Sequence, residues 1–128
     1  MFGRMLDAWA KDVAMDLGTA NTLIYLRGKG VVLDEPSMIS IDEDTGRVVA
    51  VGNEAKNLAG RHGGQMRIVR PLRDGVIHDI DVAGQMIRHF LARVFTRLPL
   101  SRPKMVIAVP TGVTSIEKRA VLEAADMA

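Results

Sequence analysis

The sequence predicts an α/β protein in which helices flank a mixed β-sheet. Short apolar runs, separated by turns rich in glycine and polar residues, fill the first half of the chain and indicate β-strands. The second half holds two segments with apolar residues at helical spacing, and a continuous apolar run separates them. This order of strands, helix, buried strand and helix is typical of a layered α/β domain.

The composition is that of an ordinary globular domain. With 128 residues, the chain is long enough for one domain with a hydrophobic core. Because it lacks cysteine, it can hold neither a disulfide nor a thiolate-bound metal. The formal net charge is only +2 and aromatic residues make up 4%, so we expect no nucleic-acid partner.

Residues 1–11 are predicted to form an amphipathic N-terminal segment. Its apolar residues fall on one stripe at helical spacing, and they include Met1, Phe2, Met5, Leu6 and Trp9. Two interpretations are open: the stripe packs on protein, or it lies in the plane of a membrane with Trp9 at the lipid headgroups. So short a helix would bind lipid weakly, and self-association of the chain would have to strengthen the binding.

Four strands are predicted in the first half of the chain. The first two cover 12–17 and 21–26, with a turn of small and polar residues between them. A third apolar run covers 31–41, and Pro36 places a break or a sheet edge within it. A polar turn then leads to a fourth strand over 47–52.

Capping and turn signals place the elements that follow. Asn53 caps one or two helical turns that Gly60 ends. An irregular extended segment comes next, with a turn at Asp74–Gly75. It leads to a helix over 81–96, for which Asp79 or Asp81 provides the N-terminal cap.

The last two elements are a strand and a helix. The continuous apolar run over 104–109 predicts a strand that is covered on both faces. The helix after it begins with a capping box formed by Thr114 and Glu117. The apolar side of this helix is predicted to consist of Ile116, Ala120, Val121, Ala124 and Met127. If sheet neighbours lie in sequence beyond this chain, exposed apolar edges would favour aggregation.

The turn between the first two strands carries more polar groups than a hairpin needs. Asp16 is predicted near the end of a buried strand, where an unpaired charge is costly. Gly18 allows a tight turn, and the following threonines and asparagine offer donors beside backbone N–H groups. This pattern fits a phosphate cradle next to a hydrated Mg²⁺ ion. It equally fits a structural turn in which Asp16 caps local N–H groups.

No other group of residues indicates a catalytic or metal site. His62, His78 and His89 are far apart in the sequence, with no pair spaced for one helix face. The serines lack the context of a nucleophile elbow, and the chain contains neither a Walker-type loop nor a dinucleotide-binding glycine motif.

Four segments, in this order, resemble the bacterial actin-like cell-shape proteins of the MreB family. They are "DLGTANTLIYLRGKGVVLDEPSMISI", "AVGNEAKNLAGR", "IVRPLRDGVI" and "VIAVPTGVTSIEKRAVLEAA". The Asp-Leu-Gly-Thr motif is shared with actins, chaperones of the seventy-kilodalton class and sugar kinases, so it indicates only the superfamily. The Ala-Asn-Thr extension and the run from Gly-Lys-Gly to Glu-Pro-Ser are more specific for the family.

The resemblance implies an actin-like (ribonuclease H-like) ATPase fold, of which this chain forms a part of the first domain. Residues 12–30 and 67–128 would belong to subdomain IA, and residues 31–66 approximately to subdomain IB, the small outer subdomain. The implied cofactors are ATP and Mg²⁺. Asp16 would hold Mg²⁺ through water, and the residues facing the ATP phosphates would be Gly18, Thr19, Ala20, Asn21 and Thr22.

The implied function is that of a cell-shape-determining cytoskeletal protein. Such a protein binds ATP, polymerises into filaments on the inner face of the cytoplasmic membrane and guides peptidoglycan synthesis during elongation. Its partners would be other protomers, the membrane and membrane proteins of the elongation complex. Because the N-terminal segment binds membrane in many Gram-negative members, the resemblance favours the anchor interpretation of residues 1–11.

Two features of the chain depart from the family pattern. Family members are more than twice as long, and this chain lacks their second phosphate loop. Because phosphoryl transfer needs both walls of the site, we expect the chain alone neither to hydrolyse ATP nor to bind it tightly. The alternatives are another ATPase of the superfamily, or a non-catalytic module that binds filaments or membrane.

Overall fold

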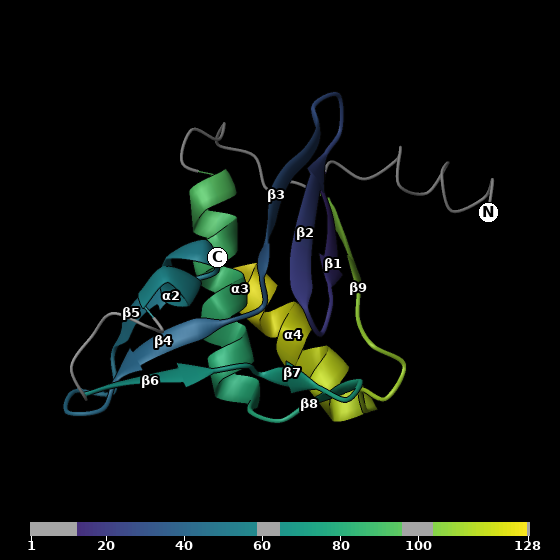
Figure 1. Ribbon diagram of the computed structural model, residues 1–128. Coiled ribbons are helices and arrows are strands. Elements are labelled where there is room, and N and C mark those ends of the chain that lie inside the picture. The colour runs from purple at the N-terminus through teal and green to yellow at the C-terminus, as the bar shows by residue number, and fades with distance from the viewer. Residues whose placement is uncertain (1–12, 59–64, 96–103, 128) are drawn as a thin grey trace.

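The computed structural model describes residues 13–58, 65–95 and 104–127 (Figure 1). Across these ranges, every helix is too short or too polar to cross a membrane. The amphipathic segment predicted over 1–11 lies outside the described residues.

A four-stranded mixed sheet forms the larger layer of the molecule, as predicted. Strands β1 (Val13–Leu17), β2 (Asn21–Leu26) and β3 (Gly30–Pro36) follow one another as an antiparallel meander. Strand β9 (Met105–Ala108) comes from the far end of the chain and pairs with β1 in parallel. The order of strands in this sheet is therefore β3-β2-β1-β9.

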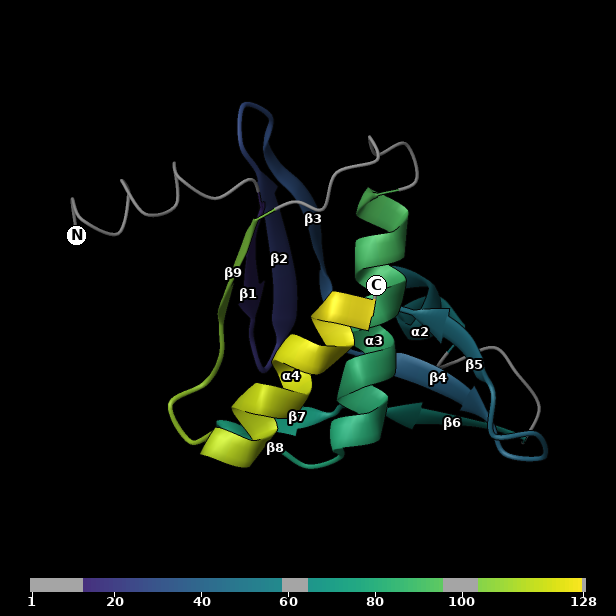
Figure 2. The same ribbon diagram turned by 180° about the vertical axis from the view of Figure 1, so that it is seen from behind.

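Helices α3 (Ile80–Val94) and α4 (Ser115–Met127) lie together on one face of this sheet (Figure 2). Because alternate residues of a strand point to opposite faces, every second residue of β1 faces the helices. Buried side chains from both layers form the core, and they include Val13, Met15, Leu17, Ile24, Met86, Ile87, Phe90, Leu91 and Val121.

A second, three-stranded sheet stands beside the larger one (Figure 1). Its central strand β4 (Ile39–Asp42) pairs antiparallel with β5 (Val48–Val51) and with β6 (Met66–Val69). The short helix α2 (Asn53–Leu58) packs on this sheet through a small cluster of Met38, Ala50 and Ala55.

A two-stranded hairpin links the small sheet to α3. Strands β7 (Leu72–Arg73) and β8 (Val76–Ile77) are joined by the predicted turn at Asp74 and Gly75. Both turn residues have positive φ angles, 54° and 76°, which is the backbone of a type I′ hairpin turn.

The apolar run predicted as one strand over 31–41 is divided between the two sheets. Pro36 ends β3, which confirms the predicted break, and Ser37 and Met38 lead directly into β4. A proline has no N–H for the ladder, so pairing ends there and the chain is free to turn toward the second sheet.

The predicted caps of α3 and α4 are confirmed, whereas Asn53 is the first residue of α2 rather than its cap. Asp79 accepts a hydrogen bond from the Val82 N–H at 3.1 Å and caps α3. In the capping box of α4, Thr114 N–H donates to the Glu117 carboxylate (2.9 Å) and Glu117 N–H donates to Thr114 Oγ1 (3.2 Å). The bond from the Thr114 N–H lowers the pKa of the Glu117 carboxyl below its ordinary value.

The predicted apolar side of α4 is wrong at Ile116, which is 82% exposed, and the side chain of Met127 lies outside those that the structure describes. Val121 and Ala124 are buried, and a Cβ placed on Gly84 of α3 would lie 3.4 Å from Ala124 Cβ. The two helices therefore make their close contact near Ala124, and the first turn of α4 lies away from α3 (Figure 2).

The prediction that strand 104–109 is covered on both faces is also wrong for the described residues. Met105 and Ile107 are half-buried on the side of the helices, whereas Val106 is 41% exposed on the opposite face. There, side chains from four strands line an open and largely apolar depression: Ala14, Asp16, Leu23, Tyr25, Val31, Val106 and Ala108.

This open apolar face predicts concentration-dependent self-association of the chain. Replacing Val31 and Val106 together by threonine keeps the β-branched shape but makes the face more polar. On gel filtration, the double variant should elute later than the unchanged chain at the same high concentration. Val49→Thr is the matched control, because Val49 is equally exposed (47%) but lies on the small sheet. A monomeric elution of the unchanged chain at every concentration would contradict the prediction.

Candidate functional site

The parallel pairing of β1 with β9 brings two loops to the same edge of the large sheet. The turn of residues 18–20 follows β1, and the loop of residues 109–114 follows β9. In Figure 1, both leave the lower end of the sheet, toward the β7–β8 hairpin. In α/β folds, ligands bind preferentially outside the carboxyl ends of such strands.

Gly18 is required by the tightness of the β1–β2 turn. Its N–H donates to Asn21 O at 3.1 Å. A Cβ built on Gly18 would lie only 2.5 Å from that same oxygen, so any side chain would force the turn open.

The predicted phosphate-binding residues divide into outward and inward groups. Thr19, Ala20 and Asn21 are exposed, and the Asn21 amide donates to Asp34 Oδ1 at 2.9 Å. Thr22 is fully buried, and its hydroxyl forms a 2.9 Å hydrogen bond with that of Ser37. A contact of the Thr22 side chain with a phosphate would require this buried bond to break.

Asp16 is exposed, which corrects the prediction of a charge in a buried strand. It pairs with Leu23 on one side and Ala108 on the other, within the sheet. Because Met15 and Leu17 face the helices, the carboxylate between them must point to the open face.

Ser37 was not assigned to the site from the sequence, yet it contacts both ends of the turn. Its hydroxyl donates to Gly18 O at 2.6 Å, and its N–H donates to Ala20 O at 2.9 Å. The signal available in the sequence was a serine directly after the proline that was predicted to break the strand.

Two residues before Ser37, the buried carboxylate of Glu35 links three elements. It forms a bidentate ion pair with Arg93 of α3, and its Oε1 also accepts the Asn53 N–H at 3.0 Å. Burial disfavours the charged carboxylate, but the bonds from Arg93 and from the Asn53 N–H outweigh it, so the pKa of Glu35 lies below its ordinary value.

Gly52 lets this contact form. Its φ angle is 68°, and a Cβ built there would meet Glu35 Oε1 and lie 2.9 Å from Phe90 Cε1. The backbone of the β5–α2 turn therefore approaches Glu35 and α3 more closely than any side chain would permit.

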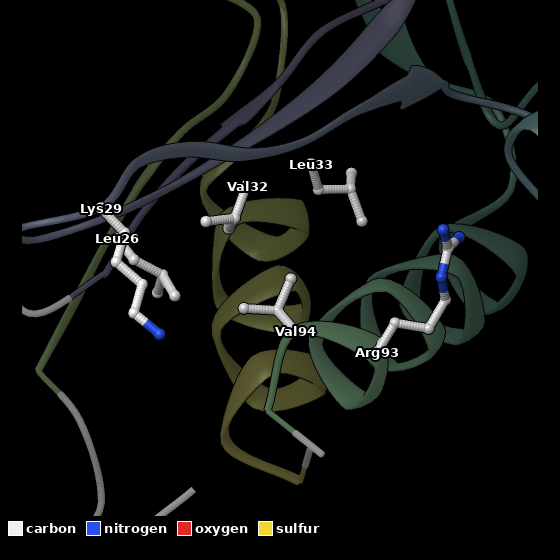
Figure 3. Close-up of a pocket in the computed structure, with 6 residues that line it drawn as sticks. All are labelled: Leu26, Lys29, Val32, Leu33, Arg93 and Val94. Carbon is white, nitrogen blue, oxygen red and sulfur yellow. The ribbon is translucent and has the colours of Figure 1, made fainter. Parts of the chain in front are cut away.

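A shallow pocket lies at the other end of the large sheet, beside the β2–β3 turn (Figure 3). It is lined by Leu26, Lys29, Val32, Leu33, Arg93 and Val94. The Lys29 amine and the Arg93 guanidinium lie on opposite sides of Val94 and do not converge. Without convergent polar groups, this pocket is a poor small-molecule site. Within the described ranges, no three His, Cys, Asp or Glu side chains gather as metal ligands.

The fold places the chain in the class of actin-like proteins. It matches the crystal structure of MreB5 of Spiroplasma citri bound to ADP with a TM-score of 0.75 and 36% identity, over 90% of this chain and 34% of that one. It matches the MamK double helical filament with a TM-score of 0.70 and 25% identity, over 90% of this chain and 38% of that one.

The sequence comparisons narrow this class to one family. The chain is 46% identical to the cell shape-determining protein Mbl of Bacillus subtilis (92% of this chain, 35% of that protein). It is 40% identical to the cell shape-determining protein MreB of Escherichia coli K12 (98% of this chain, 38% of that protein). The family model described as MreB/Mbl protein matches residues 10–128, and the chain belongs to this family. It spans little more than a third of the length of these relatives.

The Glu35 ion pair predicts a pH-dependent contribution to stability. Because the pKa of Glu35 is lowered in the folded chain, its stabilisation is present above the ordinary pKa of a glutamate and is lost as the pH falls from there through the lowered folded pKa. Arg93 is half-exposed, so Glu35→Gln should lower the free energy of unfolding by only about 1–2 kcal/mol at pH 7, and by less at pH 3.

Urea unfolding followed by circular dichroism at both pH values measures this difference. Glu43→Gln is the control, since Glu43 is exposed on the turn between β4 and β5. An equal loss of stability at pH 3 and pH 7 for Glu35→Gln would rule out the ionic contribution.

Proposed function

We propose that this chain supplies the phosphate-binding wall of an actin-like, cell-shape-determining protein that binds ATP, polymerises and guides peptidoglycan synthesis. The observation that carries the proposal is the β1–β2 turn. It lies at the carboxyl end of a parallel strand pair, and Thr19, Ala20 and Asn21 are exposed on it. The MreB5 structures of Spiroplasma citri are bound to ADP and AMPPNP, which supports a nucleotide as the ligand.

The residues present fit a hydrated Mg²⁺ ion better than a metal cage formed by protein. Asp16 offers one exposed carboxylate two residues before the turn, and the described residues hold no cluster of further ligands around it. Mg²⁺ commonly keeps several waters and binds through one or two carboxylates plus substrate phosphates. When bound, the ion would neutralise phosphate charge, and Asp16 would accept hydrogen bonds from its water ligands.

The relatives extend well beyond the matched part, since the chain covers 34–38% of them. We propose that the opposite wall of the nucleotide site belongs to that additional sequence. The chain alone then contacts the phosphates from one side and leaves the base and ribose in water, so its affinity is low.

A titration of the isotope-labelled chain with MgATP, followed by nuclear magnetic resonance, tests the proposal. The amide signals of residues 18–22 should shift and approach saturation only at millimolar nucleotide. Calorimetry should detect no micromolar dissociation constant, and no phosphate should be released. Unmoved amide signals in the turn at millimolar MgATP would refute phosphate binding, whereas micromolar affinity or hydrolysis would refute the single-wall role.

In the same titration, Asp16→Asn distinguishes the contribution of the metal to binding from that of the nucleotide. It should weaken MgATP binding by roughly three- to tenfold, the effect of a contact of about 1 kcal/mol, and change metal-free ATP binding less. Asp44→Asn is the matched control, because Asp44 is equally exposed but lies on the turn after β4.

We further propose that the protein acts on the inner face of the cytoplasmic membrane, with residues 1–11 as an in-plane anchor. The apolar stripe of Met1, Phe2, Met5, Leu6 and Trp9 supports this proposal. Its partners there would be other protomers, for which the MamK filament is a structural parallel, and membrane proteins of the elongation complex.

Co-sedimentation with anionic liposomes compares the whole chain with a version that lacks residues 1–11. The whole chain should pellet with lipid in the larger fraction, because its apolar stripe enters the headgroup region. A version with Trp9→Ser controls for the change in length and should lose part of the binding. Equal pelleting of the whole and shortened chains would exclude the anchor.

A further inference from the structure

We propose that Ser37 is a positioning residue that holds the β1–β2 turn in its ligand-binding shape and ties it to the small sheet. This inference rests on the proposed phosphate-binding role of the turn. Ser37 is completely buried and lies behind the turn, so it acts on a ligand only through the residues that it holds.

Ser37 bonds the turn at two points. Its hydroxyl donates to Gly18 O at 2.6 Å, and its N–H donates to Ala20 O at 2.9 Å. With both carbonyls held from behind, the backbone from Gly18 to Ala20 is restrained in one conformation before a ligand arrives. Such preorganisation reduces the entropy lost on binding.

Hydrogen-bond accounting gives the direction of the buried contact between Ser37 and Thr22. A serine hydroxyl has one proton, and that proton is used in the bond to Gly18 O. In the 2.9 Å contact between the two hydroxyls, Thr22 must therefore be the donor. The result is a directional chain from Thr22 through Ser37 to Gly18, in which each bond polarises the next.

Ser37 is itself anchored from both sides along the chain. On one side, Glu35 is bound by Arg93 and by the Asn53 N–H. On the other side, Met38 O accepts the Gly52 N–H at 2.8 Å, immediately before β4 begins. The position of the turn is therefore tied to the small sheet through a segment that has little freedom to move.

Ser37→Ala tests this role, with Ser40→Ala as the matched control. Both serines are completely buried, but the Ser40 hydroxyl donates to Met66 Sδ in the small sheet, away from the turn. Ser37→Ala should speed hydrogen exchange of the amides at residues 18–21 and weaken MgATP binding. Each change should be about three- to tenfold, as expected for the loss of the one hydrogen bond that the Ser37 hydroxyl donates to the turn. Ser40→Ala should change neither quantity.

Thr22→Val provides a second variant that conserves side-chain volume. It removes the donor to Ser37 but leaves the Ser37–Gly18 bond, so its effect on the turn should be smaller than that of Ser37→Ala. In the double variant, the two effects should be less than additive because both residues belong to one chain of bonds.

Hydrogen exchange in the turn tests this inference, and MgATP binding by the unchanged chain tests the proposed function, so the two can fail independently. If the unchanged chain does not respond to MgATP, the proposed function fails, while amide exchange in the turn still tests Ser37. Equal exchange in the turn for Ser37→Ala and Ser40→Ala overturns the positioning role. If Ser37→Ala does not fold, hydrogen exchange is measured in Thr22→Val instead. Loss of the Thr22 donor should weaken the Ser37–Gly18 bond, so unchanged exchange at residues 18–21 in that variant also overturns the positioning role.

Discussion

The packing of β1 against α3 and α4 is the constraint on which the site depends. Val13, Met15 and Leu17 are almost completely buried, so the residues between them must face the other side of the sheet. A register slip of one residue would bury Asp16 and expose Val13, Met15 and Leu17. No local contact could offset the resulting loss of stability. The outward direction of the carboxylate is thus a consequence of core packing.

The segment from Glu35 to Met38 joins the two sheets and also supports the turn. A buried carboxylate is costly unless it is fully bonded, and Glu35 meets this requirement with Arg93 and the Asn53 N–H. Because Gly52 has no side chain, the backbone of the β5–α2 turn can approach Glu35 closely. A single crossing of the chain therefore fixes the small sheet, α3 and the back of the β1–β2 turn relative to one another.

Local signals predicted the elements well, because caps and turns involve neighbouring residues. Asp79, the capping box of Thr114 and Glu117, and the Asp74–Gly75 turn all form as expected. The assignment of strands to sheets depends on distant pairing, so the break at Pro36 was predicted, but the placement of the two halves of the run 31–41 in different sheets was not. The exposure of Ile116 and Val106 was missed for the same reason, since periodicity does not reveal which neighbour covers a face.

The polar residues of the β1–β2 turn are compatible with both interpretations of the turn, a structural hairpin and the proposed phosphate cradle. Thr22 turns inward to Ser37 and stabilises the hairpin, as a structural turn needs. Asn21 bonds Asp34 across to β3, while Thr19 and Ala20 remain exposed at the edge of the sheet. A phosphate cradle must be rigid before its ligand binds, because ordering it afterwards would reduce the affinity. The buried bonds behind the turn and the exposed residues in front of it are therefore compatible with the proposed phosphate-binding role.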